Sequence, residues 1–191
     1  MDRIIGAFTF RKGIYAEVEH DTTFTGTAWI LVAVVSVLGQ LGASAAGGFD
    51  DLVGWLVRTL IGIIFALVGF AVAVAVVNWI GRAVFKAEVT FGELVRTLGL
   101  AYVWQAVGLL GVLGAISVAL ASIVALAQLA ATLAGLAAWF VAVKEALDLK
   151  WLQVIITVVI AWVVIIALTV VAGLVVGLLG FGAAAAGGLL S

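Results

Sequence analysis

The sequence of 191 residues is 66% hydrophobic and 10% charged, with a net charge of −1, no cysteine and a mean hydropathy of +1.40. A water-soluble domain needs far more polar surface, so this composition predicts a membrane protein. It also excludes a basic nucleic-acid-binding surface, a disulfide framework and thiolate metal sites.

Residues 1–22 are predicted to form an amphipathic segment on the cytoplasmic surface of the membrane. Ile4, Phe8, Tyr15 and Val18 recur at near-helical spacing, and charged residues lie between them. The apolar run at the start of the chain is short and is interrupted by two basic residues. This pattern is not typical of a cleavable signal peptide.

Residues 23–191 are predicted to form one transmembrane domain of five helices. A helix rises 1.5 Å per residue, so about 20 apolar residues cross the hydrocarbon core. The fold class is therefore all-α, a polytopic bundle of transmembrane helices. The long uncharged stretches place the spans at about residues 24–44, 59–80, 97–115, 122–143 and 151–176. Residues 173–191 are rich in Gly and Ala and leave a weak sixth span open.

The basic residues predict how the five spans are oriented. If the spans alternate, eight of the nine Lys and Arg residues fall on one side of the membrane, and only Arg58 falls on the other. The positive-inside rule then places the N-terminus in the cytoplasm and the C-terminus outside. These charges also fix the ends of the spans, because a Lys or Asp at the centre of a transmembrane helix costs about 2.5–3.5 kcal/mol on insertion scales.

Small residues predict where helices pack closely. Ala130, Ala134, Ala138 and Ala142 recur at four-residue spacing, and Gly173–Gly177 forms a second small-residue pair. Such ridges let helix backbones approach each other, since apolar side chains gain little by leaving lipid.

No catalytic residue, metal ligand or cofactor-binding residue is predicted. The single histidine, His20, cannot form a protein-only metal site, and no acid or base lies within a predicted span, so a proton relay lacks its usual groups. Four uncharged polar side chains lie at or within the span limits, where they either join helices by hydrogen bonds or line a pore: Asn78, Gln105, Gln128 and Gln153.

Three loop motifs resemble those of a known family, the Yip1 domain. The chain reads "WIGRAVF" from Trp79, followed by "TFGELVRTLGLA" from Thr90. It also reads "VAVKEALDL" from Val141 and "IYAEVEHDTTFTGTA" from Ile14, which are similar to the prokaryotic branch of that family. The resemblance implies a five-span protein of the prokaryotic cytoplasmic membrane with a cytoplasmic N-terminus. It marks these positions in the cytoplasmic loops as interaction or bracing residues: Arg82, Arg96, Gly99, Lys144, Glu145 and Asp148.

The chain departs from the family pattern in the third span. Family members usually have a proline a few residues into that span, whereas Trp104 stands there in a chain that contains no proline. A proline kinks a helix because it removes one hydrogen bond and clashes with the preceding turn. We therefore expect an unkinked helix from about Leu98 to Leu113, with the Trp104 indole against protein.

The leading functional prediction is a Yip1-like membrane protein that is not an enzyme, needs no cofactor and acts by contacts with membrane lipids, other membrane proteins or itself. One alternative is an accessory subunit of a larger respiratory or photosynthetic membrane complex. A second alternative is a small channel or carrier for a neutral solute, which glutamines lining one cavity would favour.

For the charged loops we expect Arg82 or Arg96 to pair with Glu145 or Asp148. The simpler alternative is that the loops only stop the spans from sliding into lipid.

Overall fold

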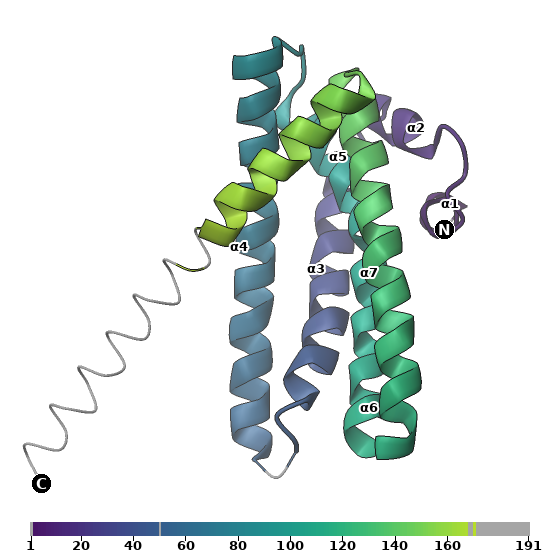
Figure 1. Cartoon of the computed structure of the whole chain (residues 1–191), viewed down its shortest axis with the longest axis vertical. Coiled ribbons are helices and arrows are strands. Elements are labelled where there is room, and N and C mark those ends of the chain that lie inside the picture. The colour runs from purple at the N-terminus through teal and green to yellow at the C-terminus, as the bar shows by residue number, and fades with distance from the viewer. Residues whose placement is uncertain (1, 50, 168–169, 171–191) are drawn as a thin grey trace, which may run out of the picture.

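The described part of the chain, residues 2–49, 51–167 and 170 of a computed structural model, is built from helices (Figure 1). It contains no strand, so the all-α prediction is confirmed for these residues. Two short helices at the N-terminus, α1 (Asp2–Phe8) and α2 (Ile14–His20), precede the long helices of the bundle.

The bundle consists of four long helical runs and one further helix. The first two runs are α3 (Phe24–Ala45) and α4 (Leu52–Phe85). The third is composite and runs through α5 (Phe91–Ala101), the 3₁₀ helix η1 (Tyr102–Leu110) and α6 (Gly111–Ile116). The fourth is α7 (Val118–Leu147), and a helix described over Trp151–Ala167 follows it and lies obliquely to the others in Figure 1.

Four runs are long and apolar enough to cross a membrane: residues 24–45, 52–85, 91–116 and 118–147. They contain the first four predicted spans. The helix Trp151–Ala167 is apolar but shorter within the described residues. The predicted fifth span extends past residue 167, and the Gly173–Gly177 pair and the sixth span lie outside the described residues.

The third run differs from the sequence-based prediction. Its α-helix ends at Ala101, and Tyr102–Leu110 continue as a 3₁₀ helix. The predicted continuity from about Leu98 to Leu113 is confirmed, because Phe91–Ile116 is one helical run, but the middle part of that run is 3₁₀ rather than α-helical. A 3₁₀ helix has three residues per turn, so residues three apart share one side. This aligns Tyr102, Gln105, Gly108 and Gly111.

Glycines on α3 and the third run bring two backbones into direct contact. A Cβ added to Gly42 would lie 1.9 Å from the Gly108 carbonyl oxygen, and one added to Gly111 would lie 2.6 Å from the Gly42 carbonyl oxygen. Similarly, a Cβ on Gly108 would lie 3.0 Å from the Gly39 Cα. Gly108 and Gly111 have no side chain, so the backbone of η1 and α6 fits directly against α3 at these two residues.

The alanine ridge of α7 packs over only part of its length. Ala138 and Ala142 are fully buried, whereas Ala134 is half-buried and Ala130 is exposed. The buried half lies near the end of α7 where α2 and α5 cover it. The closest helix contacts therefore involve the glycines of α3 and the third run rather than this ridge.

The apolar side of α2 contacts protein. Ile14, Tyr15 and Val18 are buried in the same core cluster as Leu98 of α5 and Val143 of α7. The amphipathic pattern of the N-terminal segment correctly indicates helices, but the apolar face of α2 is covered by α5 and α7 and is not presented to lipid.

We expect Gly42→Ala to destabilise the protein. Its methyl group would overlap the Gly108 carbonyl oxygen, and overpacking of this kind costs about 1–3 kcal/mol. Gly26→Ala in the same helix is the matched control, because a Cβ there meets nothing within 4 Å. Thermal unfolding in detergent should show a lower midpoint for Gly42→Ala and no loss for Gly26→Ala; equal midpoints would contradict the backbone contact.

Candidate functional site

One end of the bundle gathers the N-terminal helices and two of the interhelical loops. There α1 and α2 lie beside the start of α5, and α2 also lies beside the end of α7; the end of α4 is at the same end of the bundle, on the other side of these helices (Figure 1). We call the polar surface of residues 2–23, 82–93 and 144–150 the end face. It contains seven of the nine basic residues. Arg96 is buried behind it, and Arg58 lies near the start of α4, at the other end.

A capping box fixes the start of α5 on the end face. The Thr90 hydroxyl accepts a hydrogen bond from the Glu93 backbone N–H at 3.2 Å, and the Glu93 carboxylate accepts one from the Thr90 backbone N–H at 2.8 Å. This reciprocal arrangement satisfies two free backbone donors. It places Arg96 in the first turns of a helix that is buried from Leu94 onward.

Arg96 is only 5% exposed and binds the last turn of α2. Its Nε donates to the carbonyl oxygens of Val18 at 3.0 Å and of Glu19 at 2.9 Å, and its Nη2 also donates to the Glu19 oxygen. Its Nη1 donates to Thr25 Oγ1 at 3.1 Å at the start of α3. The last carbonyls of a helix lack partners within the helix, so the guanidinium satisfies them and joins α2, α3 and α5.

A second arginine holds α1 against α2. Arg3 Nε pairs with Glu17 Oε1 at 2.9 Å, and Arg3 Nη1 pairs with Asp21 Oδ2 at 2.7 Å. Arg11 Nη2 also pairs with Glu17, at 2.5 Å. A hydrogen bond from the Thr23 hydroxyl, together with the Arg3 guanidinium, holds the pKa of Asp21 below its usual range. The N-terminal helices therefore form an ion-paired unit.

The predicted pairing of the charged loops is not found. No ion pair within the described residues joins Arg82 or Arg96 to Glu145 or Asp148; Lys144 instead lies 3.7 Å from Glu145 and stacks over the Trp151 ring at 5.8 Å. Arg96 is directed to backbone carbonyls of α2, and Arg82 is exposed. Arg96 therefore braces the N-terminal segment rather than the turn after α7.

Two further motif positions have packing or turn roles. A Cβ on Gly99 would lie 3.2 Å from the Ala28 Cβ, so Gly99 allows α5 to approach α3 closely. Asp148 ends α7 with a left-handed backbone, φ 49°, and the following helix begins at Trp151. The charged island is thus a tight turn between two helices.

Burial and neighbouring charges on the end face act on the carboxyl group of Glu19. Burial raises the pKa of Glu19; His20 lowers it, and three other carboxylates raise it further: Asp148, Glu93 and Glu145. The neutral form of Glu19 is therefore favoured more in the folded protein than in the unfolded chain.

We expect Arg96→Ala to destabilise the protein by about 3 kcal/mol or more, because each hydrogen bond to a charged group contributes roughly 1.5–3 kcal/mol. Arg96→Lys should restore only part of this, since an ammonium group lacks the planar fork. Arg82→Ala is the control, because Arg82 is exposed. The effect is measured by thermal unfolding and by the rate of tryptic cleavage after Arg11. If trypsin cleaves the Arg96→Ala protein as slowly as the Arg82→Ala protein, Arg96 does not hold the N-terminal segment.

Glu19→Gln is expected to raise stability at pH 8. Because the pKa of Glu19 is raised by folding, wild-type stability falls as the pH rises above the ordinary glutamate range, whereas the amide does not titrate. The advantage of the variant should therefore shrink as the pH is lowered to 5. Glu88→Gln, at an exposed position, should show no such trend in thermal unfolding.

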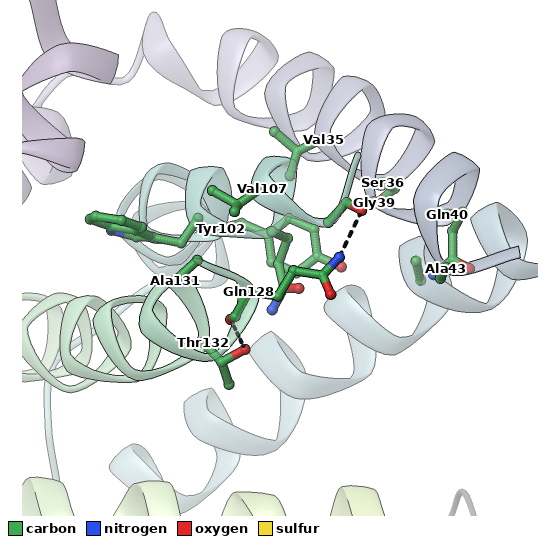
Figure 2. A pocket seen from close by; sticks show the side chains of 14 residues that line it. Val35, Ser36, Gly39, Gln40, Ala43, Tyr102, Val107, Gln128, Ala131 and Thr132 are labelled. Atoms are coloured by element: carbon green, nitrogen blue, oxygen red, sulfur yellow. Dashed lines mark hydrogen bonds between the residues drawn. The ribbon is translucent and has the colours of Figure 1, made fainter. Parts of the chain in front are cut away.

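Away from the end face, the bundle contains a polar cavity of about 320 Å³ between α3, α4, η1 and α7 (Figure 2). Figure 2 shows Tyr102 and Gln128 between α3 and α7. Gln128 Nε2 donates to the Gly108 carbonyl oxygen at 3.2 Å. Gln40 and Gln105 also line the cavity, and their side-chain amides are not hydrogen-bonded to another described residue.

Sequence reasoning identified only part of this cavity. It selected Gln105 and Gln128 as polar groups within spans, and both line the cavity. It missed Ser36, Gln40 and Tyr102, although Ser36 and Gln40 are four residues apart in the first predicted span, a spacing that puts both on one helix face. Tyr102 and Gln105 are three residues apart, and the 3₁₀ geometry aligns both with Gly108 on the side of the run that faces α3.

The Trp104 indole lies against protein, as predicted. Its ring centroid is 5.0 Å from that of Phe8 in an edge-on contact and 5.6 Å from that of Phe10 in a stacked one. Trp104 also lines the polar cavity, and its fully covered Nε1 has no acceptor among the described residues.

A family model, the Yip1 domain, matches residues 5–172. This range includes the polar cavity and all of the end face except residues 2–4. A search of curated proteins and a search of solved structures each gave no match.

Proposed function

The chain belongs to the Yip1 domain family, and we propose that it is a membrane protein without catalytic activity that acts through contacts with proteins or lipids at its end face. The binding of Arg96 to α2 carries this proposal. A buried guanidinium that joins α2, α3 and α5 makes the end face a folded surface instead of a set of separate loops.

The charges of the end face suggest the chemistry of a partner. Four exposed basic side chains have no ion-pair partner among the described residues: Lys12, Arg82, Lys86 and Lys150. Exposed cations on a fixed surface favour acidic protein segments or anionic lipid headgroups.

The same charges support the orientation and location that we propose. We infer five spans in a prokaryotic cytoplasmic membrane, with the end face in the cytoplasm. The positive-inside rule supports this arrangement, because the other end of the bundle has Arg58 as its basic residue among the described ones.

Photocrosslinking in native membranes tests this function. A benzophenone amino acid at Glu88, on the end face, should give discrete adducts, whereas one at Val53, which is 72% exposed at the other end, should give few. Reversing two charges with Arg82→Glu and Lys86→Glu should reduce the Glu88 adducts several-fold, because complementary charge favours association. Equal adducts at both positions, or adducts insensitive to charge reversal, would contradict the proposal.

A further inference from the structure

The polar cavity lies next to a second, apolar cavity. The second cavity has a volume of about 380 Å³ and shares Tyr102, Trp104 and Gln105 with the first. Its walls come from α4, α5, η1, α7 and the helix Trp151–Ala167, and its aromatic residues besides the shared ones are Phe70, Trp139 and Trp162. The two cavities are adjacent and share five lining residues; we call them together the hollow, with a polar lobe and an apolar lobe.

The polar lobe offers hydrogen-bonding groups that protein does not use. The side-chain amides of Gln40 and Gln105 are not hydrogen-bonded to another described residue, and the covered Trp104 Nε1 has no described acceptor. A tryptophan N–H can only donate, so it requires an acceptor oxygen. Buried polar groups are normally satisfied, so the covered indole N–H calls for an acceptor. Gln105 is exposed and Gln40 is half-buried, so their amides are free to bind a molecule that enters the lobe.

The position and charge of the hollow restrict that molecule. No lining residue of either lobe carries a charge. Ala66 and Gln128 lie well inside α4 and α7, away from the charged ends of these helices. An anionic headgroup would have no cation there, and burying an unpaired charge is strongly unfavourable.

We propose that this hollow binds an uncharged lipid whose polar end carries carbonyl or hydroxyl oxygens. The oxygens occupy the polar lobe, where the Trp104 N–H and the amides of Gln40 and Gln105 donate to them. The hydrocarbon part occupies the apolar lobe between α4, α7 and the helix Trp151–Ala167. This site is separate from the end face, and the inference does not depend on the function proposed for that surface.

The apolar lobe distinguishes a lipid from a small water-soluble solute. A polyol or another neutral solute would use the polar lobe alone, whereas a lipid needs both. Trp162 is 42% exposed and Ile166 is 59% exposed, so the wall formed by the helix Trp151–Ala167 is next to the surrounding lipid. A hydrocarbon chain can therefore pass from the apolar lobe into the bilayer.

The test uses the full chain in phosphatidylcholine vesicles with three photoreactive probes that carry a diazirine in the hydrocarbon chain. One probe is a diacylglycerol, one is an isoprenoid quinone and one is a phosphatidylglycerol. We expect the diacylglycerol or the quinone to label peptides of α4 and α7, and the more strongly labelling probe identifies the source of the oxygens. The phosphatidylglycerol should label them roughly tenfold less.

Two pairs of variants locate the labelling. Gly69 lines the apolar lobe and has nothing within 4 Å of an added Cβ, so Gly69→Phe fills the lobe; Gly26→Phe is the matched control, because Gly26 is also unobstructed but does not line the hollow. Gln105→Leu removes a donor from the polar lobe, and Asn78→Leu removes an amide of α4 that lines neither lobe and whose oxygen accepts no hydrogen bond from a described residue. Labelling should fall roughly tenfold in Gly69→Phe and Gln105→Leu and change less than about twofold in the controls.

Four results would overturn the proposal. The first is that neither uncharged probe labels the protein, and the second is that phosphatidylglycerol labels it as strongly as they do. The third is that Gln105→Leu leaves the labelling unchanged. The fourth is that free glycerol protects the site from labelling as well as unlabelled diacylglycerol or quinone does. The last result would identify the hollow as a site for a neutral solute. Because the side-chain amide of Gln105 is not hydrogen-bonded to another described residue, its substitution tests the site even if Gly69→Phe does not fold.

Discussion

The contact between the backbones of α3 and the third run determines much of the remaining structure. Gly39 and Gly42 face Gly108 and Gly111, and a methyl group at Gly42 or Gly111 would overlap backbone atoms of the opposite helix. The three-residue spacing of Gly108 and Gly111 matches the period of a 3₁₀ helix. The same alignment directs Tyr102 and Gln105 into the space between α3, α4 and α7, so the polar cavity follows from this contact.

The start and the middle of the third run have different roles. At its start, the Thr90–Glu93 capping box positions Arg96 so that it reaches the carbonyls of α2. Farther along, the chain loses regular α-helical hydrogen bonding and surrounds a hollow with uncharged polar groups. A single helical run therefore contributes both to a charged surface at one end of the bundle and to a neutral interior site.

The sequence predicted the class of fold well and the contacts less well. Uncharged runs of the length of a membrane span identify helices because hydrocarbon leaves the backbone few other options, and family motifs in the loops identify the Yip1 domain. The partners of Arg96 could not be predicted, because backbone carbonyls of α2 have no sequence signature. The 3₁₀ segment was missed for a similar reason: Gly108 and Gly111 become informative only when the glycines of α3 are known to face them.

Trp104 connects two regions that are otherwise separate. One side of its ring contacts Phe8 and Phe10 of the N-terminal segment, and the residue also forms part of the wall of both cavities. A molecule that shifts the indole when it enters the hollow must also change the free energy of docking of α1. By thermodynamic reciprocity, a partner that displaces α1 must change the affinity of the hollow by the same factor. Trp104 is thus the side chain through which any such coupling between the N-terminal segment and the hollow would pass.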